Sequence, residues 1–176
     1  MATIAMIGAG SLVFCKTLMA DFLATPALAG SEYRLMALTH TRLDKMKDFV
    51  ERMIRDNGVD ATVMATTDRR EALRGADYVI VMLQAGGVEE FRQDYEIPLK
   101  YGVDQCIGDT MGPGGVFRAL RHIPALLEIA HDMRTLCPRP SCSTTRIRWP
   151  CVAGRSGGCP ACSSSACVTA SRPRWI

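Results

Sequence analysis

The sequence has 176 residues, of which 48% are hydrophobic and 22% charged, and its formal net charge is +3. This length allows one domain with a sizeable core. No apolar run is long enough to cross a bilayer, and the first residues do not form a secretory leader, so we expect a cytoplasmic protein without a membrane partner.

The net charge averages two unlike parts of the chain. Residues 138–176 contain six Arg, no Lys and no acidic residue, so residues 1–137 hold 15 basic against 18 acidic side chains. This mild acidity gives no reason to expect nucleic-acid binding. Five of the eight Cys also lie after residue 137, whereas Cys15, Cys106 and Cys137 are scattered as in a reduced cytosolic protein.

The first informative motif lies near the amino terminus. Residues 3–7 predict a buried strand, and Gly8 and Gly10 follow where a helix is expected to begin. In a dinucleotide-binding βαβ unit, the first glycine permits a tight turn and the second leaves room for a pyrophosphate at the helix N-terminus. Val13 stands where a third glycine is usual, so a tight turn without a ligand is the alternative.

Apolar periodicity and turn residues predict the other elements in chain order. The predicted strands are residues 3–7, 33–38, 62–65 and 78–83, and the predicted helical segments are residues 12–23, 43–54, 68–73, 88–101 and 116–133. Residues 108–115 are too rich in glycine for a regular element, and Pro124 is expected to kink the last helix.

The alternation of strands and helices predicts an α/β fold with a Rossmann-like, doubly wound parallel sheet. Ligands of such sheets bind beyond the carboxyl ends of the strands. The Gly8 turn, the end of the second strand and residues 84–87 all fall at this edge. Three breaks at one edge favour a nucleotide site over a turn without a ligand.

Three segments carry a resemblance to glycoside hydrolase family four. They are residues 7–14, residues 75–87 and, most specifically, the Gly-Asp-Thr-Met-Gly-Pro-Gly-Gly segment at residues 108–115 with its continuation to Arg121. The resemblance covers about residues 2–137 and points to the α-glucosidase, α-galactosidase and α-galacturonidase members. The first two segments alone would equally suit lactate and malate dehydrogenases.

The resemblance implies an enzyme that uses NAD and a manganese ion. In this family NAD oxidises C3 of the sugar, a tyrosine removes the C2 proton and the glycosidic bond breaks by elimination, without the paired carboxylates of other glycosidases. A Cys and a His of the intact family hold the metal, which acts as a Lewis acid. Intact members are expected to be homo-oligomers that act on a small glycoside.

The resemblance also implies site residues in this sequence. Cofactor binding is expected from Gly8, Gly10, Ser11, Leu12, Thr39, Gln84, Ala85 and Gly86, and substrate binding from Asp109 and Thr110. For Asp109 the alternative is an N-cap of the helix that begins near Val116. No catalytic or metal-ligating residue is assigned in this chain.

Two parts of the sequence depart from the family pattern. Ala37 stands where the family has an acidic residue for the adenosine ribose, and this change should weaken NAD binding by about 1–3 kcal/mol. Residues 138–176 resemble nothing in the family, contain no acidic residue, Leu, Met, Phe or Lys, and lack the metal-binding Cys–His pair.

A reading-frame slip would explain both departures. Synonymous codons for residues 142–151, read one base earlier, can encode Leu-Leu-Asn-Tyr-Thr-Asn-Pro-Met-Ala-Met, a segment that the family carries after this helix. The same shift over residues 163–172 can encode a segment like the family's metal-binding cysteine region, and a short compensated slip over residues 37–41 would restore an acid. We therefore predict an NAD-binding domain at residues 1–137 and a disordered, out-of-frame tail at residues 138–176.

The chain by itself is expected to bind NAD weakly and to be inactive, because the metal ligands, the base and a substrate domain are not found in it. One alternative is part of a 2-hydroxy-acid dehydrogenase, against which the glycine-rich segment argues. Another is a nucleotide-binding module with zinc held by Cys159 and Cys162, but a second ligand pair is not evident and no His follows position 131.

Other polar residues are expected to have structural roles. His122 and His131 lie on the last predicted helix, where surface exposure or a hydrogen bond within the fold is more common than catalysis. Arg69 and Arg70 are expected on a solvated face, and Cys15 in the core.

Overall fold

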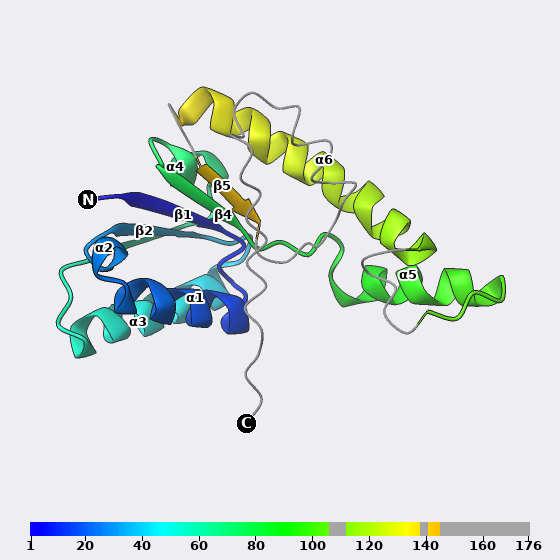
Figure 1. The fold of residues 1–176 in the computed structure, drawn as a ribbon, viewed down its shortest axis with the longest axis horizontal. Helices are drawn as coiled ribbons and strands as arrows, with labels where there is room; N and C mark the ends of the chain where they lie inside the picture. Colours follow the sequence, from blue (N-terminus) through cyan, green and yellow to red (C-terminus); the bar gives the residue numbers. More distant parts are fainter. Residues whose placement is uncertain (106–111, 138–140, 145–176) are drawn as a thin grey trace.

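The computed structural model describes residues 1–105, 112–137 and 141–144. Its centre is a parallel sheet of five strands in the order β3-β2-β1-β4-β5 (Figure 1). The strands are β1 Thr3–Ile7, β2 Glu32–Met36, β3 Thr62–Thr66, β4 Tyr78–Val81 and β5 Ser141–Thr144. This order reverses between β1 and β4, which is the switch point of a doubly wound fold.

Helices cover both faces of this sheet and extend past one of its edges. They are α1 Leu12–Ala24, α2 Pro26–Ala29, α3 His40–Asp56, α4 Arg69–Leu73, α5 Gly87–Lys100 and α6 Pro113–Leu136. Figure 1 shows α1 and α3 against one face, and α4 with the carboxyl half of α6 against the other. The α5 helix and the amino half of α6 lie side by side beyond the carboxyl edge of the sheet.

Alternating side chains of the inner strands supply both halves of the core. From β1, Ile4 and Met6 pack with Cys15 and Met19 of α1, whereas Ala5 and Ile7 face the opposite layer. Because both faces are covered, β1 is apolar at every position after Thr3, as parallel strands usually are. Each large apolar side chain buried in this way contributes about 1.5–3 kcal/mol.

The structure confirms the predicted fold class and most of the predicted elements. The β1, α1 and α3 segments begin or end within three residues of the predicted bounds, and β4 is a central strand as expected. The second and fourth strands are each two residues shorter at the carboxyl end, because the chain turns out of the sheet there. The short helix α2 was not predicted. The last helix continues through Pro124.

The predicted irregular segment at residues 108–115 is wrong in its last part. Pro113, Gly114 and Gly115 form the first turn of α6, and Gly112 is its N-cap. Pro suits the first helical position, where a missing N–H costs nothing. Gly114 and Gly115 are buried. The N-cap role considered for Asp109 therefore belongs to Gly112.

Residues 141–144 were predicted to be disordered, but they form β5 and pair in parallel with β4, from Tyr78 with Ser141 to Val81 with Thr144. The physical reason is that β4 would otherwise present a row of unpaired N–H and C=O groups. Residues 138–140 and 145–176 of the predicted tail lie outside the described residues, and the boundary at residue 137 stays a prediction.

One of the two arginines expected on a solvated face differs from that expectation. Arg69 does not lie on a solvated face: its guanidinium donates to Asp132 at 2.6 Å and to Glu128 at 3.3 Å, which joins α4 to α6. Arg70 is exposed as predicted, and its Nε lies 3.9 Å from the carboxylate of the same Asp132. Across the part of the chain that the structure describes, no helix is both long and apolar enough to span a bilayer.

Candidate functional site

The turn between β1 and α1 lies at the switch point of the sheet. The backbone N–H groups of Gly8 and Ala9 both donate to the carbonyl of Met36, at 2.9 and 2.8 Å, and so attach the turn to the end of β2. Gly8 has φ +92°, and a Cβ there would lie 2.2 Å from the carbonyl oxygen of Met82 after β4. Gly8 is therefore required by the fold itself.

Gly10, two residues later, has more space around it than Gly8. Its φ is not positive, and a Cβ at this position would make ordinary contacts, 3.5 Å from the Cβ of Ala37 and 3.7 Å from that of Arg42. Nothing among the described neighbours requires a glycine here. A glycine that the fold does not need leaves the backbone open to close approach by another molecule.

The amino end of α1 follows directly and points to the same edge. Ser11 is the N-cap residue, and its side chain makes no capping hydrogen bond to the helix. The first turn of α1 contains no acidic residue, so the positive end of the helix dipole is not neutralised locally. Leu12 and Val13 are 61% and 71% exposed, which leaves an apolar surface beside the backbone N–H groups at the amino end of α1.

The end of β2 forms the second side of the site. Ala37 is buried, and Leu38 is 88% exposed. Thr39 is the N-cap of α3 and makes no side-chain cap, and no acidic residue lies in the first turn of this helix. Arg42, in that turn, is exposed and lies beside Gly10. Arg42 was not among the predicted site residues, although an Arg near the end of the second strand is the residue that accommodates the 2′-phosphate in NADP-binding folds.

The segment after β4 forms the third side. Gln84 and Ala85 are partly buried, and Gly86 is exposed with φ +80°, where it serves as the N-cap of α5. The Gln84 side-chain oxygen accepts from Nη2 of Arg118 at 2.7 Å. The Ala85 N–H donates to Nε2 of His122 at 3.2 Å. Two residues of α6 thus hold this segment.

The electrostatics of the third side depend on a buried histidine. His122 is 1% exposed, and burial lowers the pKa of its imidazole below the usual 6.5. The nearby Arg118 and Arg121 act in the same direction, whereas the hydrogen bond to the Arg118 carbonyl and the charge of Asp94 oppose it. The Arg121 guanidinium has its own pKa raised by the hydrogen bonds to Asp94.

The structure places eight predicted cofactor residues at the carboxyl edge of the sheet. They are Gly8, Gly10, Ser11, Leu12, Thr39, Gln84, Ala85 and Gly86. The two predicted substrate residues, Asp109 and Thr110, lie outside the described residues. The sequence did not indicate that Arg118 and His122 reach the third segment, because contacts across 34 and 37 residues depend on the tertiary fold.

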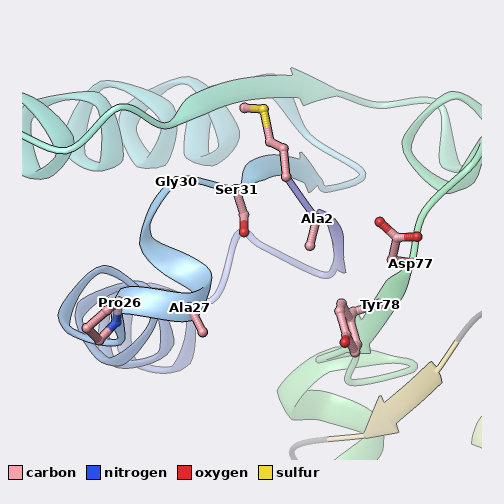
Figure 2. Close-up of a pocket in the computed structure, with 8 residues that line it drawn as sticks. Ala2, Pro26, Ala27, Gly30, Ser31, Asp77 and Tyr78 are labelled. Carbon is pink, nitrogen blue, oxygen red and sulfur yellow. The ribbon is translucent and has the colours of Figure 1, made fainter.

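A pocket of about 540 Å³ opens at the opposite edge, near the amino ends of the strands. Figure 2 shows Pro26 and Ala27 on one side of it and Asp77 and Tyr78 on the other, with Ser31 between them. The Asp77 carboxylate accepts the N–H of Thr3 at 2.9 Å, so it serves the fold. Since ligands of doubly wound sheets bind at the carboxyl ends, this pocket is not the candidate site.

Comparison with known proteins identifies the family. Residues 3–142 match the model of the family described as Family 4 glycosyl hydrolase. This chain belongs to that family. An α-galactosidase of Rhizobium meliloti (strain 1021) is 45% identical over 131 residues, which are 74% of this chain and 27% of that protein. An α-galactosidase of Bacillus subtilis (strain 168) is 41% identical over 139 residues, which are 78% and 32% of the two chains.

Solved structures agree with this family 4 assignment. A 6-phospho-β-glucosidase from Thermotoga maritima, solved with manganese, NAD+ and glucose-6-phosphate, matches with a TM-score of 0.72 at 28% identity over 82% of this chain and 34% of that one. A lactate dehydrogenase from Cryptosporidium parvum matches with a TM-score of 0.51 at 17% identity over 82% and 37% of the two chains, which shows a shared fold alone. The chain spans about a quarter to a third of the length of the curated relatives it matches.

A metal site needs several donor side chains close together. Within residues 1–105 and 112–137, no group of three or more His, Cys, Asp or Glu side chains is arranged to hold a metal ion. Cys15 and Cys137 are buried free thiols, and the Cys137 thiol donates to the carbonyl of Leu73 at 2.9 Å. These described residues do not fit a manganese site.

Proposed function

We propose that this chain forms the NAD site of a family 4 glycosyl hydrolase, at the carboxyl edge where β1, β2 and β4 end. The observation that carries the proposal is the contrast between the two glycines. Gly8 is required by the fold, whereas Gly10 is not. Gly10 lies beside the amino end of α1, where the Ser11 side chain makes no capping hydrogen bond. A pyrophosphate needs both an open backbone and free amides at a helix N-terminus.

The residues of the three segments have distinct roles in this proposal. The backbone at Gly10, Ser11 and Leu12 would receive the pyrophosphate, with Arg42 adding positive charge. Thr39 would lie at the adenosine ribose. The Gln84, Ala85 and Gly86 segment would lie against the nicotinamide half. When bound, NAD supplies a reversible acceptor for a hydride from the substrate.

For the complete activity, we propose hydrolysis of an α-glycoside. The names of the relatives at 45% and 41% identity favour an α-galactoside, and α-glucosides and α-galacturonides are the neighbouring possibilities. Asp109 and Thr110 are proposed to contact the sugar. Because the described residues do not fit manganese, no step through a metal is assigned to them.

We also propose a cytoplasmic location and self-association for the intact enzyme. A site that depends on NAD needs a compartment where that cofactor is present. No nucleic-acid or membrane partner is proposed, since the first 137 residues carry more acidic than basic side chains.

Calorimetric titration of the full chain with NAD tests the cofactor site. We expect a single site that binds NAD, and AMP more weakly because AMP lacks the nicotinamide half. A parallel assay with 4-nitrophenyl α-galactoside, NAD and Mn²⁺ tests whether the chain turns over substrate. The proposal would be overturned if millimolar NAD produced no heat of binding in calorimetry and no change in the backbone amide signals in NMR.

A further inference from the structure

The two ring nitrogens of His122 have different partners, and this identifies its tautomer. Nε2 lies 3.2 Å from the backbone nitrogen of Ala85, and Nδ1 lies 2.8 Å from the carbonyl oxygen of Arg118. A backbone N–H can only donate, so Nε2 must be an unprotonated acceptor. Nδ1 therefore carries the proton and donates a hydrogen bond to the carbonyl oxygen of Arg118, and the ring is neutral.

The residue at the other end of this contact belongs to the proposed cofactor site. Ala85 lies between the last residue of β4 and the N-cap of α5, in a segment without regular structure. Gly86 holds a left-handed conformation, and a Cβ there would lie 2.2 Å from Cγ of Glu90. The positive φ favours glycine at this position. The α6 helix provides an acceptor for the segment at Ala85 and a donor at Gln84.

We propose that His122 is a positioning residue of the dinucleotide site: its neutral ring holds Ala85 and thereby shapes the 84–86 segment that receives the cofactor. This proposal rests on the proposed function, because it assigns a task to His122 within the same site. His122 is not proposed to touch the cofactor. It acts through one backbone hydrogen bond, one helical turn away from the Arg118–Gln84 contact.

Protonation would reverse the role of Nε2. A protonated Nε2 is a donor, and it would face the N–H of Ala85, which is also a donor. The contact would then be replaced by repulsion, and the 84–86 segment would lose its attachment to α6. NAD affinity should therefore be constant while the ring is neutral and should fall as the pH decreases through the pKa of His122.

The charged groups around His122 influence the pH at which its ring is protonated. On its own helix they are Arg118 and Arg121, and on α5 it is Asp94, whereas the 84–86 segment has no charged side chain. Glu90 of α5 acts on Arg121. Asp94 is already paired with Arg121, so its charge is largely compensated. Burial and the two guanidinium groups favour the neutral ring, and the change is expected below pH 6.5.

NAD titrations of the full chain between pH 5 and pH 8 test this inference with three variants. His122→Gln carries an amide oxygen that can accept from Ala85 at the reach of Nε2, so it should bind NAD within about twofold of wild type and lose the pH dependence. His122→Met removes the acceptor at similar volume and should weaken binding at pH 7.5 by about 3- to 10-fold, the effect of one hydrogen bond. The exposed His131→Gln is the control and should behave as wild type.

Nitrogen NMR of the same samples separates this inference from the NAD proposal. In wild type without cofactor, the His122 signals should report the Nδ1–H tautomer, and the Ala85 amide should shift as the ring titrates. A chain that fails to bind NAD but shows this linked titration would overturn the proposed function and retain the attachment of Ala85. An Ala85 amide that does not follow the ring, or His122→Met with wild-type affinity and pH profile, would overturn the role of His122.

Discussion

The Arg121 guanidinium donates to both carboxylate oxygens of Asp94, at 2.6 and 2.5 Å, and so joins α6 to α5 beyond the edge of the sheet. The Asp94 side chain is 4% exposed and that of Arg121 is 24% exposed. A bidentate pair of this kind has a defined geometry as well as charge. It fixes α6, which holds the 84–86 segment, against α5, which follows that segment.

Removing one partner of this pair should be costly. Asp94→Asn removes the bidentate counter-charge of a largely buried guanidinium, and we expect the free energy of unfolding to fall by about 3 kcal/mol. Glu96→Gln on the same helix is the matched control, because its exposed pair with Arg92 is worth less than about 0.5 kcal/mol. Urea unfolding measures both, and equal effects of the two variants would contradict the importance of the buried pair.

Two glycines with positive φ separate steric clash from backbone strain. Alanine at Gly8 meets the Met82 carbonyl at 2.2 Å, whereas alanine at Gly58 has no atom within 4 Å. Both substitutions carry the left-handed strain of about 1–2 kcal/mol. Gly8→Ala should therefore lower the free energy of unfolding by several kcal/mol, and Gly58→Ala only by the strain. Similar losses for the two variants in urea unfolding would show that the β1–α1 turn is looser than described.

The sheet and the two sides of the site at β1 and β2 are predictable from local sequence. A strand that is apolar on both faces, followed by Gly8 and Gly10, has few alternatives to a βαβ unit. The start of α6 is not predictable in this way, because glycines at positions 114 and 115 oppose a helix unless tertiary contacts bury them.

The third side of the site depends on contacts that no local pattern encodes. His122 has the spacing of an ordinary core residue of α6, and only the folded chain brings it to Ala85. The same holds for Arg69, whose sequence neighbours indicate a polar turn, while its partners Glu128 and Asp132 lie about 60 residues later.

Gly10→Ala should weaken NAD binding without weakening the fold. The added Cβ makes only van der Waals contacts with Ala37 and Arg42, and reduced freedom of the unfolded chain favours alanine by about 0.4–1 kcal/mol. At the cofactor, the same methyl group should reduce the affinity at least about tenfold, or 1.4 kcal/mol. Gly30→Ala, whose Cβ lies 3.4 Å from the Asp60 carbonyl, is the control. Unchanged calorimetric affinity in Gly10→Ala would place the pyrophosphate elsewhere.

Cys15 should be unreactive in the folded chain. Burial raises the pKa of its thiol from 9.0 to about 12, so almost no thiolate exists at pH 8. Alkylation followed by peptide mass spectrometry should label Cys15 only after unfolding.

The same pKa difference has a consequence for stability at high pH. Above pH 9 the unfolded thiol releases its proton and the folded one does not, so stability should fall as the pH rises from 9 towards 12, by about 1 kcal/mol per unit. Cys15→Ala should remove this part of the slope. An unchanged slope in that variant would assign the alkaline loss to other groups, such as Tyr33, whose pKa burial also raises.

Ala37→Asp should strengthen NAD binding and discriminate against NADP. An aspartate at the end of β2 can accept hydrogen bonds from the adenosine ribose, which are worth about 1–3 kcal/mol, or roughly 5- to 150-fold in affinity. Ala37 is 6% exposed, so the new carboxylate should also lower the stability of the chain without cofactor. NADP is the informative comparison, because its 2′-phosphate would meet Arg42 favourably in wild type and the carboxylate unfavourably in the variant. Calorimetry with both dinucleotides should therefore show opposite changes, and parallel changes would mean that residue 37 does not lie at the ribose.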